Sequence, residues 1–178
     1  MKRLLILSLL LLVAIQCDRP AVKPLQSVEP AQADTTLGHE APDFVLSALD
    51  GDSLQLSSLR GRVVVLNFWA TWCVPCLHEM PALSRMHAAL SPAGLTVLGV
   101  SMDTEGIDIV RHYANRLNVT YPILLGNGEI ANNYDSVVAL PMTYIIDEQG
   151  IIRRRFVGLF DVNALQTEMD AYLARKSG

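Results

Sequence analysis

Two cysteines separated by two residues occupy the middle of the chain, in the stretch WATWCVPCLHEMP (residues 69–81). This spacing suits part of a metal site, a structural disulfide, or a dithiol that exchanges with other disulfides. A structural zinc site needs four ligands, and the nearest histidine, His78, would point away from Cys76 on a helix. Two thiolates are enough for Cu(I), so a non-catalytic copper-binding module remains an alternative.

The position of the pair favours thiol–disulfide exchange. A disulfide across two intervening residues removes little chain entropy, so a purely structural bond would stabilise the protein little. Cys73 follows an apolar run and precedes a helical pattern, and a helix N-terminus favours the thiolate of a cysteine placed there. Pro75 fits the first helical turn. Cys73 is therefore the predicted nucleophile, and Cys76 the thiol that resolves the mixed disulfide.

The elements that must position this pair alternate between strands and helices. VVVLNFW (63–69) is typical of a strand covered on both faces. Apolar residues recur at helical spacing over 76–90, where Pro81 predicts a kink. The remaining expected elements are a hairpin around 50–52, strand 95–102, helix 107–117, strand 121–126, helix 129–136, hairpin 143–158 and a last helix capped by Asp161. This order predicts an α/β fold, a mixed central sheet with helices on both faces.

The N-terminal segment has the pattern of a secretory signal. Lys2 and Arg3 precede a 12-residue stretch, 4–15, that is apolar apart from one serine and is too short to span a bilayer comfortably. Residues 1–17 are therefore expected to contain a signal peptide followed directly by Cys17, and 18–37, rich in proline and alanine, to be a flexible tether. The folded domain is expected over 38–178.

The charge balance bears on the partners of the domain. Without the signal, twelve basic and eighteen acidic residues remain, a net charge of −6. Nucleic-acid binding depends on clustered lysines and arginines that neutralise phosphates, so we expect no nucleic-acid partner.

NFWATWCVPC (67–76) resembles the active site of the thioredoxin superfamily. With the signal, the tether and LPMTYIID (140–147), the chain resembles the membrane-anchored TlpA/ResA-type group over residues 38–176. The resemblance implies a thioredoxin-like fold with an N-terminal hairpin extension. It also implies a thiol-disulfide oxidoreductase whose redox centre is a Cys73–Cys76 disulfide, with no metal and no other cofactor. Members of the group usually reduce disulfides of proteins, often of apocytochrome c, and a membrane thiol reductant is the electron donor that this analogy indicates.

The resemblance also implies a substrate-binding surface around the cysteines. Trp72 matches a tryptophan that shields the disulfide and offers an apolar docking surface, and Pro75 belongs to the same surface. Pro141 matches a cis-proline that faces the disulfide. The backbone of Leu140 would then pair with an extended substrate segment.

A buried carboxylate of thioredoxin, which helps to move the proton of the resolving thiol, is replaced here by Asn67. Glu79 matches an acidic residue of the ResA-like group and lies three residues after Cys76, on the same side of the expected helix. Glu79 is therefore expected to take the place of that carboxylate in acid–base catalysis and to take part in substrate recognition. The alternative is a solvated helix carboxylate.

Cys17 resembles the lipid-acceptor cysteine of a bacterial lipoprotein signal, although Gln16 departs from the small residue usual before it. Lipidation would anchor the domain to a membrane, so that it lies in the bacterial periplasm or on the outer face of the inner membrane. The alternative is an ordinary signal peptide or an uncleaved anchor, with Cys17 incidental.

A thiol peroxidase of the same fold is the main rival. Those enzymes place a threonine three residues before the peroxidatic cysteine and a proline further upstream. Here that position is Ala70, and residues 63–72 contain no proline.

Overall fold

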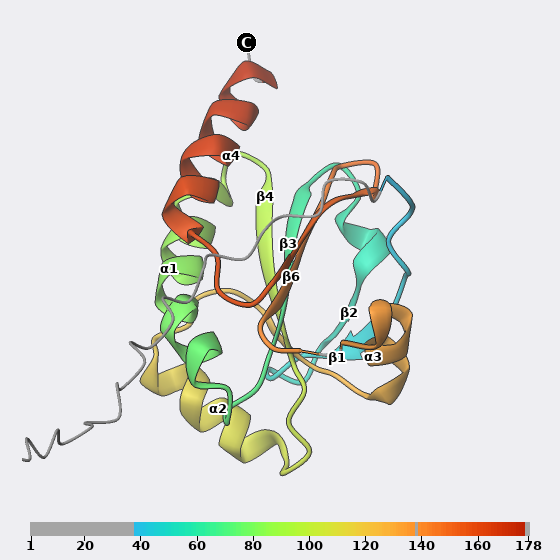
Figure 1. Ribbon diagram of the computed structural model, residues 1–178, viewed down its shortest axis with the longest axis vertical. Helices are drawn as coiled ribbons and strands as arrows, with labels where there is room; N and C mark the ends of the chain where they lie inside the picture. Colours follow the sequence, from blue (N-terminus) through green and yellow to red (C-terminus); the bar gives the residue numbers. More distant parts are fainter. Residues whose placement is uncertain (1–37, 138, 177–178) are drawn as a thin grey trace, which may run out of the picture.

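The computed structural model describes residues 38–137 and 139–176, and it has one mixed five-stranded sheet with the order β5-β4-β3-β6-β7 (Figure 1). Its strands are β3 (Val63–Trp69), β4 (Leu95–Ser101), β5 (Ile123–Leu125), β6 (Met142–Ile146) and β7 (Ile152–Val157). β3, β4 and β5 are parallel, whereas β6 and β7 run antiparallel to their neighbours. The parallel strands are joined by α1 (Val74–Leu90) and α2 (Ile107–Arg116). The predicted mixed sheet is therefore confirmed.

The central strand β3 is buried on both faces, as its apolar run predicts. Side chains alternate along a strand, so Val65 and Trp69 belong to one core, with residues of α1, α2 and α4 (Val162–Lys176). Leu66 and Phe68 belong to the other core, with residues of the N-terminal hairpin and of α3 (Gly128–Asn133). Helices thus cover both faces of the sheet.

The hairpin extension consists of β1 (Val45–Ser47) and β2 (Ser53–Gln55), which pair antiparallel as a separate two-stranded sheet. The short helix η1 (Leu56–Leu59) follows it. The hairpin is joined to the main sheet at β5, where Leu49 N–H donates to the Ile123 carbonyl at 3.0 Å. The hairpin predicted from the Asp-Gly turn is confirmed.

Two helices differ from their expected bounds by more than one residue. α1 starts at Val74, two residues before the expected start, and includes Pro81 within its 17 residues. The helix expected over 129–136 ends at Asn133 instead. The three residues 135–137, in the short η2 (Asp135–Val137), have φ values of 53°, 62° and 32°, which an α-helix cannot contain. The Asp135 carboxylate accepts hydrogen bonds from the Arg155 guanidinium at 2.7 Å and the Tyr144 hydroxyl at 3.1 Å, and these contacts stabilise the non-helical turn.

The membrane-related predictions fall on residues 1–37, including Cys17, and these lie outside the described residues. No helix in the ranges 38–137 and 139–176 is long and apolar enough to cross a bilayer.

Asp161 caps α4, as its position before the helix predicts. Its Oδ1 accepts the N–H groups of Asn163 and Ala164, both at 3.0 Å. Asp161→Ala leaves these amides without their acceptor, so we expect it to lower the free energy of unfolding by about 1 kcal/mol. Urea titration measures the change, with Asp170→Ala, an exposed position on the same helix, as the control. An Asp161→Ala midpoint equal to that of the wild type would contradict the assigned cap.

Candidate active site

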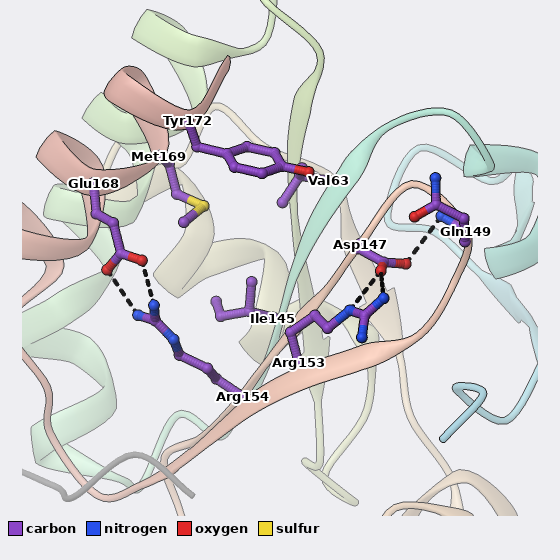
Figure 2. A pocket seen from close by; sticks show the side chains of 9 residues that line it. All are labelled: Val63, Ile145, Asp147, Gln149, Arg153, Arg154, Glu168, Met169 and Tyr172. Carbon is purple, nitrogen blue, oxygen red and sulfur yellow. Dashed lines mark hydrogen bonds and ion pairs between the residues drawn. The ribbon is translucent and has the colours of Figure 1, made fainter. Parts of the chain in front are cut away.

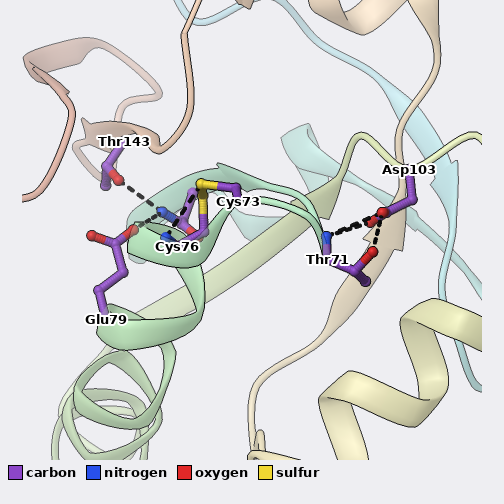
Figure 3. The surroundings of a disulfide bond; sticks show 7 residues. Thr71, Cys73, Cys76, Glu79, Asp103 and Thr143 are labelled. Atoms are coloured by element: carbon purple, nitrogen blue, oxygen red, sulfur yellow. Dashed lines mark hydrogen bonds between the residues drawn. A yellow bond between two sulfur atoms is a disulfide. The ribbon is translucent and has the colours of Figure 1, made fainter.

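Cys73 and Cys76 form a disulfide at the point where β3 gives way to α1 (Figure 3). Cys73 is the N-cap residue of α1, and its Sγ accepts the N–H of Cys76 at 3.3 Å. Its sulfur therefore lies against the free amides of a helix N-terminus, which favours a thiolate there once the bond is reduced. The Cys73 side chain is 5% exposed and Cys76 is 0% exposed. Of the two sulfurs, Cys73 is the one that a substrate reaches first.

An exposed apolar surface borders the disulfide. Trp72 is 67% exposed and Val74 is 63% exposed, and Pro75 is exposed beside them. Soluble proteins seldom leave large apolar side chains grouped in this way unless the group contacts a partner. Trp69, in contrast, is buried in the core beneath.

The loop before β6 forms the other side of the site. The Leu140–Pro141 peptide bond is cis, as the resemblance implied. β6 pairs antiparallel with β3, and Phe68 lies opposite Met142, so this register brings Pro141 to the end of β3 that leads into the cysteine turn. Pro141 is buried and Leu140 is partly buried. The Pro141 carbonyl accepts the Gly158 N–H at 2.8 Å.

Glu79 is a buried carboxyl, only 4% exposed, so the alternative of a solvated helix side chain is wrong. Asn67 Nδ2 donates to Glu79 Oε1 at 2.7 Å and to Thr143 Oγ1 at 2.9 Å. The three side chains come from α1, β3 and β6 and are all buried. Glu79 thus provides a carboxyl directly beside Asn67, the position at which thioredoxin carries its own.

Burial raises the pKa of Glu79 from 4.5 to about 8, and the hydrogen bond from Asn67 opposes this rise only in part. Among the described residues, no group hydrogen-bonds to Glu79 Oε2 or to Asn67 Oδ1. A buried carboxylate with so few hydrogen-bond donors is poorly stabilised, so at pH 7 this group is mainly the neutral acid. It can therefore either give or take a proton near neutral pH. Glu79 lies three residues after Cys76 on α1, so the two side chains are on the same side of that helix (Figure 3).

A groove of about 230 Å³ opens beside Glu79, between α1 and the segment that leads from β7 into α4. Its lining residues are His78, Glu79, Ala82, Leu159, Phe160, Asp161, Val162 and Asn163. Glu79 thus borders a space that water or a substrate segment can enter. Within residues 38–137 and 139–176, no three side chains of His, Cys, Asp or Glu are grouped closely enough to hold a metal ion.

A larger hollow, of about 340 Å³, is lined by neither cysteine (Figure 2). It is lined by the start of β3, the β6–β7 hairpin and α4, and it contains none of the site residues. Arg153 pairs with Asp147, and Arg154 pairs with Glu168 across this hollow. The charged side chains that line this hollow thus form ion pairs with one another.

Asp103 is a site neighbour that sequence reasoning missed. It follows β4, and its carboxylate hydrogen-bonds to the backbone N–H and the hydroxyl of Thr71, two residues before Cys73. The parallel pairing of β3 and β4 brings the two loops together, since Trp69 lies opposite Ser101. The sequence signal that could have identified Asp103 is an acidic residue just after β4, the strand that pairs with β3.

The structure therefore brings most of the predicted residues together. Cys73, Cys76, Trp72, Pro75, Leu140 and Pro141 lie at one end of the sheet, with Glu79 beneath them on α1. Cys17 lies outside the described residues.

Comparison with known proteins places these features in context. The model of the AhpC/TSA family matches residues 37–155. The chain is 36% identical over 135 residues to the thioredoxin-like protein YneN of Bacillus subtilis, covering 75% of this chain and 78% of the relative. It is 32% identical over 135 residues to the thiol-disulfide oxidoreductase ResA of Geobacillus thermodenitrificans, covering 76% and 77%.

Solved structures agree on the fold. A putative thiol:disulfide interchange protein DsbE from Chlorobium tepidum superposes with a TM-score of 0.71 at 29% identity, covering 79% of this chain and 99% of that one. A putative protein disulfide isomerase from Bacteroides thetaiotaomicron has a TM-score of 0.71 at 30% identity, covering 82% and 94%. The mixed sheet with its helices and its N-terminal hairpin is the thioredoxin-like fold.

Proposed function

This chain belongs to the AhpC/TSA family and is a thiol-disulfide oxidoreductase of the ResA/DsbE type, and from this premise we propose that it reduces disulfides of protein substrates outside the cytoplasm. Cys73 is the attacking thiol and Cys76 the resolving thiol. The observation that supports these roles best is the difference between the two sulfurs. Cys73 is the more exposed and lies at the helix N-terminus, whereas Cys76 is fully buried one turn further on.

The reaction starts from the reduced pair. The Cys73 thiolate attacks one sulfur of a substrate disulfide, which forms a Cys73–substrate disulfide and releases the other substrate sulfur as a thiolate that takes a proton. Glu79, as the carboxylate, takes the proton of the Cys76 thiol. The Cys76 thiolate then attacks Cys73 Sγ, which restores the Cys73–Cys76 disulfide and releases the second substrate sulfur as a thiolate. This thiolate takes up a proton from solvent, and Glu79 gives up the proton that it took from Cys76. Two electrons pass to the substrate. A membrane thiol reductant then supplies two electrons that reduce the Cys73–Cys76 disulfide again.

The substrate binds across the turn and the cis-proline loop. The exposed Trp72 and Pro75 contact the apolar side chains that flank the substrate cysteine, and the backbone of Leu140 pairs with its extended chain. Apocytochrome c is the proposed physiological substrate. Its haem-attachment motif carries two cysteines and a histidine as C-x-x-C-H, so a short oxidised peptide of that sequence presents the relevant disulfide.

The function is tested with the reduced protein and two oxidised peptides. One contains C-x-x-C-H, and in the other the histidine no longer directly follows the second cysteine. We expect both peptides to be reduced and Cys73–Cys76 to become oxidised in equal amount. A faster reaction with the first peptide supports the apocytochrome substrate, and equal rates contradict it. Consumption of hydrogen peroxide without peptide reduction would instead indicate the thiol peroxidase, and tight Cu(I) binding without exchange the copper module.

We propose that the domain is held at the membrane by a lipid on Cys17, with residues 18–37 as the tether. The support is the basic, apolar and cysteine-terminated pattern of residues 1–17. Mass spectrometry of the mature N-terminus tests this proposal. A diacylglyceryl adduct on Cys17 is expected, and an unmodified Cys17 thiol would refute it.

A further inference from the structure

The Asp103 carboxylate binds the loop that carries the reactive cysteine (Figure 3). It accepts the Thr71 N–H at 3.0 Å and 3.1 Å through its two oxygens, and the Thr71 hydroxyl at 2.6 Å. It also accepts the Ser101 hydroxyl at 2.7 Å. Two hydroxyl groups and one backbone amide therefore converge on a single side chain.

The bonds from Thr71 hold a tight turn. Cys73 N–H donates to the Ala70 carbonyl at 3.1 Å, which makes Thr71 and Trp72 the two central residues of a turn that ends on Cys73. The last backbone bond between the two loops runs from Met102 N–H to the Trp69 carbonyl at 2.8 Å. Beyond that bond, the Asp103 side chain continues the connection between the end of β4 and the cysteine turn.

The turn presents the two groups that a protein substrate meets, Trp72 and Cys73. About two thirds of the Trp72 side chain is exposed, so packing against the protein does little to fix its position. The backbone of the turn must therefore set where the indole stands relative to the Cys73 sulfur. The contacts from Asp103 to Thr71 fix that backbone from one side.

We propose that Asp103 is a positioning residue for protein substrates, which acts through Thr71 to hold Trp72 and Cys73 in the geometry needed for docking and attack. This proposal rests on the proposed roles of Trp72 and Cys73. Asp103 contacts neither sulfur, so its effect depends on the size of the substrate. A small disulfide needs only to reach the Cys73 sulfur, whereas a protein disulfide must also seat its flanking chain on Trp72.

Three variants separate positioning from charge. The hydrogen bonds from Thr71 to Asp103 form a clamp on the turn, and Asp103→Ala removes both of their acceptor oxygens. Asp103→Asn removes the charge but keeps one oxygen that can accept the Thr71 N–H. Asp108→Ala is the matched control, since it removes an exposed carboxylate five residues further along the chain, which pairs with Arg111 at 2.9 Å.

The experiment compares the reduction of insulin with that of 2-hydroxyethyl disulfide by each fully reduced protein. For Asp103→Ala we expect the kcat/KM for insulin to fall about tenfold, with a change of less than about threefold for the small disulfide. Asp103→Asn should stay within about threefold of the wild type on both substrates, and Asp108→Ala should match the wild type. Amide hydrogen exchange of Thr71 should be fast in Asp103→Ala and slow in the other proteins.

Several results would overturn the proposal. They are insulin reduction by Asp103→Ala at the wild-type rate, equal losses on both disulfides, or an Asp103→Asn defect as large as that of Asp103→Ala. Fast Thr71 exchange in the wild-type protein would also contradict the clamp. If the wild type reduces neither disulfide, the proposed function itself fails, a result distinct from a wild type that works and an Asp103 variant that matches it.

Discussion

Replacing Cys73 with serine is expected to abolish reduction of a protein disulfide, whereas Cys76→Ser is expected to retain the first attack and to trap the substrate on Cys73. The burial of the two sulfurs gives the reason. Cys73 keeps a small exposed area, 5%, whereas Cys76 is 0% exposed. The rate for Cys73→Ser should fall to that of the buffer alone. Cys76→Ser should accumulate a mixed disulfide that non-reducing gels and mass spectrometry detect.

Each variant is the control for the other, because both lose one thiol from the same turn. Both are made with Cys17 also replaced by serine, so that no third thiol takes part. A substrate trapped on Cys76 in the Cys73→Ser protein would reverse the assigned roles. Trapping by neither variant would contradict attack by the pair.

Replacing Glu79 with glutamine is expected to change the pH dependence of stability. The pKa of Glu79 is about 8 in the folded protein and has its ordinary value of 4.5 when unfolded. The folded protein therefore binds this proton more tightly. The resulting stabilisation is fully present below about pH 4.5 and is lost at about 1.4 kcal/mol per pH unit as the pH rises to about 8.

Glutamine cannot ionise, so the Glu79→Gln protein should lack this loss. We expect urea unfolding to show a similar stability of the two proteins at pH 4.5, and a more stable variant at pH 8. Glu129→Gln, which replaces an exposed carboxyl at the start of α3, is the control and should follow the wild type. Parallel pH profiles for Glu79→Gln and the wild type would contradict a raised Glu79 pKa.

The same substitution should slow resolution. The Glu79 carboxylate accepts the Cys76 proton, so the wild-type rate of mixed-disulfide resolution should rise toward about pH 8. Glu79→Gln should slow this step by about 100-fold or more at pH 8 and shift the titration of Cys76. Stopped-flow release of the second substrate thiol measures it. Unchanged resolution rates and thiol pKa values would refute the role of Glu79.

The order of the elements followed from the sequence because each one carries its own periodicity. The apolar run of β3 and the Asp-Gly turn of the hairpin are local signals, and both were confirmed. The end of α3 was not predicted, because Asp135 is held out of the helix by Tyr144 and Arg155, which lie 9 and 20 residues further along the chain. A local pattern does not contain such contacts.

The cysteines and the cis-proline were found from the motif. The surroundings of Glu79 were not, because its partners Asn67 and Thr143 are on two other elements, and only the packing of α1 on the sheet brings them together. That packing buries the carboxyl and so raises its pKa. The Asp103 clamp was missed for the same reason, since Thr71 and Asp103 are 32 residues apart and meet only when β3 and β4 pair.

The reduction potential of the Cys73–Cys76 pair tests the central claim most directly. The protein is equilibrated in thiol redox buffers, and the oxidised fraction is read by alkylation and mass spectrometry. A reductant of protein disulfides should have a potential near or below that of thioredoxin, about −270 mV. A potential near about −120 mV, that of a strong oxidant, would make the protein a disulfide donor and contradict the proposed direction.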